Sequence, residues 1–161
     1  MVLALGAAAC GGRGGVGDEP LRLRATVVHA APDTIRFAVP AAARRCGDGR
    51  SLLLEGGGER GNGVLVLLRY GDSIAPGSFP VLALGDSLTA RGAAVAVRYL
   101  KGDVAHGLAL DSGAVDLTAA RESLTARVRG SGLESAVRIT LDAAFTGLPF
   151  GADTVPCRFQ P

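Results

Sequence analysis

SAVRITLDAAF, residues Ser135 to Phe145, is the stretch that decides the fold. Apolar and polar side chains alternate along it, and this period of two predicts a β-strand with one face on a core and the other in water. The apolar positions are Val137, Ile139, Leu141, Ala143 and Phe145. Similar runs lie on both sides of this stretch, so we expect it to pair with neighbours in a larger sheet.

Short alternating or apolar runs recur along the whole chain, separated by Gly, Asp, Ser and Pro turns, and predict about nine to eleven strands. The pattern favours an all-β fold, an antiparallel β-sandwich of the immunoglobulin-like or jelly-roll-like kind. The other expected strands are Leu21–His29, Thr34–Val39, Ser51–Glu55, Val64–Tyr70, Phe79–Leu84, Ala93–Leu100, Val104–Leu110 and Thr154–Phe159.

The segment Gly113–Arg129 fits two kinds of secondary structure. As strands, it turns Val115 and Leu117, then Leu124, Ala126 and Val128, toward the core. As a helix, it places Leu117, Leu124 and Val128 on one side, with Asp116 as a cap and Gly130 as the end. We prefer strands because the segments on both sides of it are strand-like.

Two segments between strands are predicted to be loops. Pro40–Gly49 contains the run AAARR, which could form one helical turn, and Gly56–Gly63 is too rich in glycine for a helix or a strand. Binding residues concentrate on loops that a rigid scaffold holds. We therefore expect any small ligand or envelope protein to bind at these two loops.

Length and composition restrict the class of protein. The 161 residues are enough for one domain with a core, and 48% hydrophobic with 20% charged residues is a globular composition. A net charge of +2 provides no broad basic field for nucleic acid or an anionic membrane face. Lys101 is the single lysine among 17 Lys and Arg residues, a bias that we attribute to a GC-rich genome rather than to phosphate recognition.

The N-terminus carries the first motif with a chemical meaning. Met1–Ala9, MVLALGAAA, is apolar and ends in small residues directly before Cys10, and a glycine-rich run follows. This arrangement resembles the lipobox of bacterial lipoproteins. The resemblance implies a signal-peptide remnant at 1–10 with lipid on Cys10, a tether at 11–19 and a folded domain at 20–161, anchored outside the cytoplasm in the cell envelope. The alternative is an ordinary buried or frayed terminus with an incidental cysteine.

Cys46 and Cys157 remain as a pair if Cys10 carries lipid. An even number of remaining cysteines in an exported chain favours a disulfide between them. Two free buried thiols or a metal site are the competing interpretations. A zinc site is disfavoured because the chain has no CxxC motif and its histidines are His29 and His106 alone. We expect both histidines to be structural residues of strands, and we expect no metal and no cofactor.

Gly85–Leu88, with the letters GDSL, resembles the nucleophile block of the GDSL esterases and lipases. The resemblance implies Ser87 as nucleophile and, from a DxxH block, Asp103 and His106 as orienting carboxylate and base. In that family the DxxH block lies much further downstream, beyond oxyanion-hole segments that are missing between these two motifs. Gly71–Ser73 repeats the letters GDS at another turn, where these residues are simply favoured.

The sequence therefore favours a non-enzymatic, lipid-anchored β-sandwich with a binding or structural role in the bacterial envelope. A GDSL-like serine esterase that uses Ser87 is one alternative. An accessory subunit whose exposed sheet edge pairs with another chain of an envelope assembly is the other alternative.

Overall fold

The computed structural model describes residues 20–29, 33–83, 85, 86, 88–119 and 123–157. This part of the chain is all-β, with eleven strands and no helix, as the sequence predicted. The strands are β1 (Leu23–Val28), β2 (Thr34–Val39), β3 (Ala41–Cys46), β4 (Ser51–Gly57), β5 (Gly63–Arg69), β6 (Gly77–Pro80), β7 (Gly92–Lys101), β8 (Val104–Ala109), β9 (Ser112–Ala119), β10 (Ser123–Glu134) and β11 (Val137–Val155).

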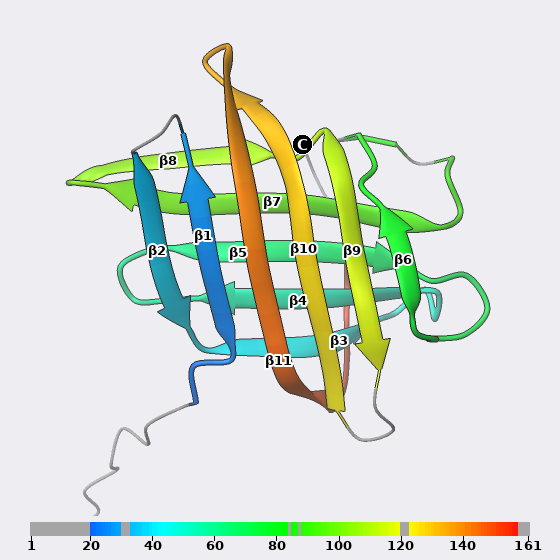
Figure 1. Ribbon diagram of the computed structural model, residues 1–161. Coiled ribbons are helices and arrows are strands. Elements are labelled where there is room, and N and C mark those ends of the chain that lie inside the picture. Colours follow the sequence, from blue (N-terminus) through cyan, green and yellow to red (C-terminus); the bar gives the residue numbers. More distant parts are fainter. Residues whose placement is uncertain (1–19, 30–32, 84, 87, 120–122, 158–161) are drawn as a thin grey trace, which may run out of the picture.

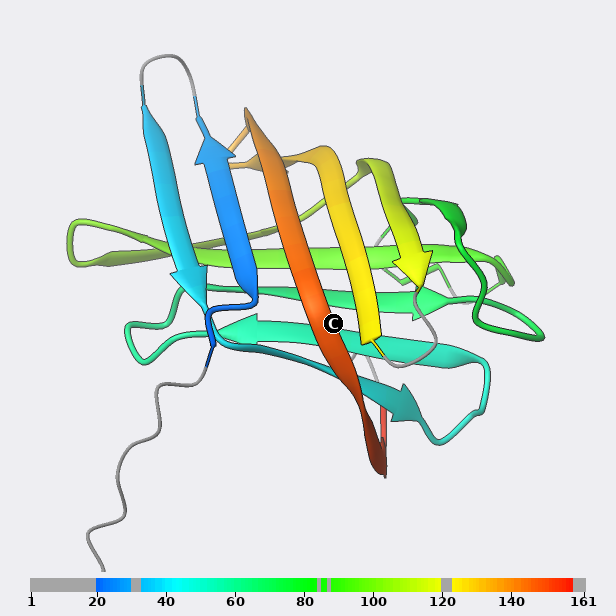
Figure 2. The ribbon, with the colours of Figure 1, turned by 60° about the horizontal axis from the view of Figure 1, so that its bottom comes forward.

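The strands form two layers that lie crosswise over one another (Figures 1 and 2). The first layer contains β2, β1, β11, β10, β9 and β6, and the second contains β3, β4, β5, β7 and β8. The layers are parts of one continuous sheet, in the order β6-β9-β10-β11-β3-β4-β5-β7-β8 with β1 and β2 beside β11. The structure is thus a curled sheet rather than two separate sheets of a sandwich.

Strand β11 joins the two layers because it belongs to both. Its first part pairs with β1 and β10 in the first layer, and Phe150–Val155 pairs with β3 in the second. The β11–β3 pairing is parallel, whereas the other strand pairings described are antiparallel. Gly147 lies at an irregularity in the first part, between Phe145 and Leu148, and has a φ of 60°, a conformation that glycine adopts without a Cβ clash.

The core fills the space between the layers with the inward side chains of both. The Ser135–Phe145 stretch supplies part of this core. Its residues Ile139, Leu141, Ala143 and Phe145 are at most 3% exposed. The second layer contributes the opposite wall of this core. The largest fully buried side chains are Tyr99, Phe79, Phe145, Leu23, Leu52, Leu54, Leu68, Leu110, Leu117, Leu124, Ile139 and Leu148.

Most predicted strands are confirmed, including the choice of strands over a helix for 113–129, which forms β9 and part of β10. The predicted loop Pro40–Gly49 is wrong, because Ala41–Cys46 is β3, paired with β4. Backbone hydrogen bonds to a neighbouring strand outweigh the helix propensity of three alanines. The Gly56–Gly63 loop is narrower than predicted, because β4 includes Gly57 and β5 starts at Gly63.

Three further boundaries differ from the prediction. β6 ends at Pro80; beyond it, Val81 donates its N–H to the Gly113 carbonyl and forms an isolated parallel bridge with Ala93. Of the predicted strand Thr154–Phe159, Thr154 and Val155 are the end of β11 and Pro156 and Cys157 follow it, whereas residues 158 and 159 lie outside the described part of the chain. Val137, predicted to face the core, is 49% exposed because it lies at the tip of the β10–β11 hairpin, beyond the crosswise layer.

The tip of the β10–β11 hairpin is under backbone strain. Glu134 pairs with Val137, so Ser135 and Ala136 are the two central residues of the turn, with φ of 48° and 67°. A two-residue hairpin turn requires positive φ at both positions, and only glycine, asparagine and aspartate adopt it at low cost.

We expect Ala136→Gly to raise the free energy of unfolding by about 0.5–1 kcal/mol, because it relieves the Cβ clash at positive φ while costing some unfolded-chain entropy. Urea denaturation monitored by far-UV circular dichroism measures this change. The control is Ala94→Gly in the middle of β7, which should instead lower stability by about 1 kcal/mol. Destabilisation by both variants would show that the turn is not strained.

Candidate functional site

The outward face of the second layer carries an open groove of about 580 Å³. It runs across β3, β4, β5 and β7. The side chains that set its character are Ala42, Arg44, Glu55, Gly57, Leu65, Ala96 and Arg98. Register explains why they meet: Ala42, Glu55, Leu65 and Ala96 lie opposite one another on successive strands.

The floor of the groove is apolar, which is unusual for a face directed away from the core. Leu65 and Ala96 are half-buried in the floor, and Leu53 and Ala94 are half-buried beside the groove on the same face, whereas the outward face of the first layer carries mainly Arg, Asp, Thr and Ser. Exposed apolar surface of this kind marks binding sites on soluble proteins. This groove is therefore the candidate ligand-binding surface.

Small residues create the hollow. Gly57 and Gly63 lie opposite each other at the ends of β4 and β5, and a Cβ built on Gly57 would meet no atom within 4 Å. The Cβ of a side chain at position 57 would therefore enter the groove without displacing any protein atom.

The rim of the groove is polar and contains one arginine with no ion pair. Arg44 pairs with Glu55 at 3.2 Å between Nη2 and Oε1. Arg98 is exposed, its guanidinium lies beside Gly61, and it has no carboxylate partner among the residues described. The rim is therefore suited to one acidic group on a ligand whose apolar part covers the floor.

The groove brings together the two segments that sequence reasoning selected for binding. Pro40–Arg44 lines one side, and residues 56–58 and 61–63 line another. The expected loop at Pro40–Gly49 is wrong because Ala41–Cys46 is β3, whereas the expected loop at Gly56–Gly63 is confined to residues 58–62 between β4 and β5. The contribution of β7, through Ala96 and Arg98, carried no signal in the sequence because it depends on β7 pairing with β5.

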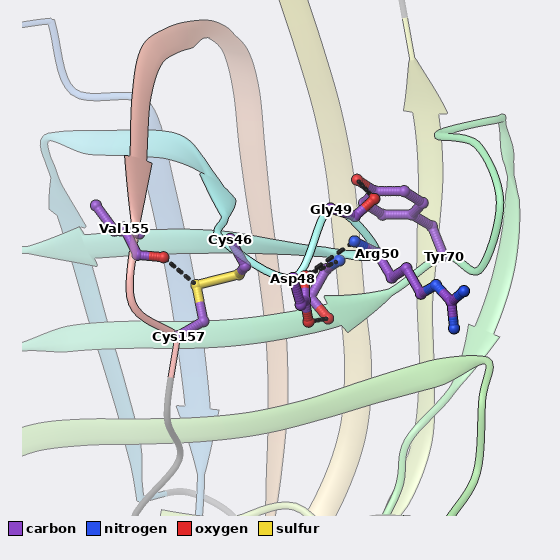
Figure 3. Close-up of a disulfide and its surroundings, with 8 residues drawn as sticks. Cys46, Asp48, Gly49, Arg50, Tyr70, Val155 and Cys157 are labelled. Atoms are coloured by element: carbon purple, nitrogen blue, oxygen red, sulfur yellow. Dashed lines mark hydrogen bonds between the residues drawn. A yellow bond between two sulfur atoms is a disulfide. The ribbon is translucent and has the colours of Figure 1, made fainter.

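A disulfide joins Cys46 and Cys157, with the two Cα atoms 5.4 Å apart (Figure 3). It links the end of β3 to the segment after β11, across a sequence separation of 111 residues. A loop of this length corresponds to about 4–5 kcal/mol in the chain-entropy model. The adjacent turn is held by Asp48, whose carboxylate accepts hydrogen bonds from the N–H groups of Arg50 and Ser51 and from the Ser51 hydroxyl.

The two parts of the hydrolase motif lie on different elements. Ser87 itself lies outside the described residues. Asp86 closes its own turn, because its carboxylate accepts hydrogen bonds from the N–H groups of Leu88 and Thr89 and from the Thr89 hydroxyl. These bonds, the Thr89 hydroxyl foremost, hold the pKa of Asp86 below its ordinary value.

His106 lies on β8, beside the far end of β7. The loop after β6 leads into the start of β7, whereas His106 pairs in register with Tyr99 near its end. The seven steps from Gly92 to Tyr99 span about 23 Å at about 3.3 Å per residue. Among the residues described, no contact joins the GDSL turn to the DxxH block.

A cluster of ionisable side chains that the sequence did not reveal lies between the layers, at the end where the β7–β8 and β10–β11 hairpins turn. Glu134 accepts a hydrogen bond from the Tyr99 hydroxyl at 2.5 Å and contacts His106 Nδ1 at 2.9 Å. The Tyr99 and His106 rings are stacked at 5.4 Å, and the His29 ring stands edge-on to both. These residues come from β7, β8, β10 and the residue after β1, so only the tertiary fold assembles them.

The side chains of this cluster are largely shielded from solvent. Tyr99 is fully buried, and the side chains of His106 and Glu134 are 27% and 19% exposed. His29 is half-buried, and its Nε2 has no hydrogen-bond partner in the described structure. A salt bridge between Lys101 and Asp33 lies nearby. The expectation of partly buried, structural histidines agrees with this arrangement.

Electrostatics keep Glu134 ionised. Burial alone would raise its pKa, but the hydrogen bonds from Tyr99 and His106 and the charge of His106 together hold the pKa of Glu134 below its ordinary value. Burial and the adjacent Glu134 raise the pKa of the Tyr99 hydroxyl, so this group stays protonated and donates. The cluster is therefore a carboxylate held by two donors, with no nucleophile among them.

Within the described ranges, no group of three or more His, Cys, Asp or Glu side chains is arranged to hold a metal ion. Nor does this part of the chain contain a helix long and apolar enough to span a bilayer. Cys10 and the tether at 11–19 lie outside the described residues.

Comparison with protein-family models, with curated proteins and with solved structures finds no match for this chain. The candidate site consequently stands on the geometry of this structure alone.

We expect Glu134→Gln to make stability less sensitive to acid. A carboxyl whose pKa is lowered by folding contributes stability above its unfolded pKa and loses it as pH falls through the folded pKa. The variant should cost about 1–2 kcal/mol at pH 7 and less toward pH 3. Urea midpoints at intervals from pH 7 to pH 3 measure this difference.

Tyr99→Phe is the matched variant, because it removes one donor and leaves His106. Its acid dependence should lie between those of the wild type and Glu134→Gln. The same acid slope in all three proteins would contradict the assignment of Glu134.

Proposed function

We propose that this protein is an exported, lipid-anchored module of the bacterial cell envelope that binds a small apolar ligand and carries out no catalytic step. The groove on the second layer is the observation on which the proposal depends. Its apolar floor and its one arginine without an ion pair suit a ligand with an apolar body and an acidic group.

Two observations support the compartment. The Cys46–Cys157 disulfide is a bond that persists in oxidising, extracytoplasmic environments and is rare in the cytosol. The resemblance of Ala7–Cys10 to a lipobox supports a lipid on Cys10. The ten residue steps from Cys10 to Pro20, across the tether at 11–19, would reach at most about 33–36 Å, which would keep the domain close to the membrane.

A second proposal is an accessory role in an envelope assembly, and the free edge of β2 favours it. β2 pairs with β1 on one side and with no other strand described, so its second edge is open for a strand from another chain. In this role the protein would bind its partner through the free edge of β2 rather than through the groove.

Mass spectrometry of the protein extracted from its native membrane tests the compartment. We expect the intact mass to include acyl chains on Cys10, and two alkylatable thiols to appear only after reduction. An unmodified chain with three free thiols would reject export. A native mass spectrum of the same extract separates a monomer from an assembly.

We expect Gly57→Leu to weaken binding of the apolar fluorescent probe N-phenyl-1-naphthylamine by about tenfold or more, because the new side chain occupies the groove. Fluorescence titration of the folded protein gives the two dissociation constants. The control is Gly107→Leu on β8, an exposed strand glycine outside the groove. Equal probe affinity in the wild type and Gly57→Leu would show that the groove is not the binding site.

A further inference from the structure

The outward face of the first layer holds five arginines on the strands described, and three of them are matched by aspartates. Arg127 makes a bidentate pair with Asp142, with contacts of 3.1 and 2.8 Å. The other matched pairs are Arg138 with Asp111 at 2.8 Å and Arg129 with Asp116 at 4.0 Å.

The remaining two arginines, Arg24 on β1 and Arg36 on β2, have no acidic partner among the residues described. Both are exposed. Arg36 lies opposite Thr26, so the two arginines are diagonal neighbours on adjacent strands. At this spacing, about 7–8 Å between the backbones, two long side chains can reach the same point.

The nearest carboxylate in register is already occupied. Asp142 of β11 lies opposite Thr26, beside Arg24, but both of its oxygens accept hydrogen bonds from Arg127. The two arginines therefore retain an uncompensated charge of +2 on neighbouring strands. Like charges this close repel each other, and nothing in the described structure offsets that cost.

The same arginines line a hollow of about 570 Å³. Small side chains form its floor, and the three guanidinium-bearing residues Arg24, Arg36 and Arg127 border it. The floor residues with outward side chains are Thr26, Ala38, Ala144 and Asp142. Asp142 is a carboxylate, but both of its oxygens are held by Arg127, so the hollow has a net positive border and one hydroxyl, from Thr26, on its floor.

We propose that this hollow is a binding site for a phosphate group. A guanidinium presents paired N–H donors that match the oxygens of a phosphate, and two such groups neutralise its double charge. Lysine cannot make this bidentate contact. The site lies on the face opposite the apolar groove, in the other layer (Figure 2), and it does not depend on the function proposed for that groove.

Isothermal titration of the full chain with inorganic phosphate and with glycerol 3-phosphate, at low salt, tests the site. We expect saturable binding by the wild type and a loss of about tenfold or more in affinity in Arg24→Gln and in Arg36→Gln. The control is Arg138→Gln, on the same face but paired with Asp111 and outside the hollow, which should bind within about twofold of the wild type. Equal affinity for the two probes identifies the phosphate group itself as the ligand, and tighter binding of the ester identifies a phosphate ester.

Thermal melting without phosphate provides a second measurement. Removal of one of two repelling charges should leave the melting temperature of Arg24→Gln and Arg36→Gln unchanged or raised. A lowered melting temperature would show that these arginines are structural. Absence of saturable binding by the wild type, or the same loss in all three variants, would overturn the proposal.

Discussion

One strand has to satisfy backbone hydrogen bonds in two layers, and the rest of the structure depends on this constraint. β11 is 19 residues long, pairs with β1 and β10 at its start, and pairs with β3 at its end. Because the two layers lie crosswise, the strand must change direction between its pairing with β10, which ends at Pro149, and its pairing with β3, which begins at Phe150. The Cys46–Cys157 disulfide then fixes the far end of this connection to β3.

The shared core leaves two outer faces of different character. The inward side chains of both layers are apolar, so each strand has only its alternate residues free for the outer surface. In the first layer these residues are arginines, aspartates and hydroxyl residues, and in the second they are leucines, alanines and glycines around a few charges. One fold therefore presents a charged face and an apolar face, and each carries a groove.

Charge pairing on these surfaces contributes little to stability, because exposed salt bridges contribute about 0–1 kcal/mol. The arginines that have no carboxylate partner are more informative about function than the paired ones. Arg98, Arg24 and Arg36 are among the described arginines that no carboxylate pairs with, and each of these three borders a hollow. The buried Glu134 cluster differs from these, because its donors come from within the fold and are satisfied there.

The sequence by itself determined the all-β class, the approximate strand positions and the inward residues of β11, because a period of two is a local property of the backbone. It also indicated the cysteine pair. It misjudged Ala41–Cys46, where pairing with β4 overrode local propensity, and Val137, whose burial depends on how far the opposite layer extends. Only the tertiary structure decided the curl of the sheet, the Glu134 cluster and both grooves. Each of these joins residues from strands far apart in sequence, and strand order and register, which bring them together, leave no local pattern.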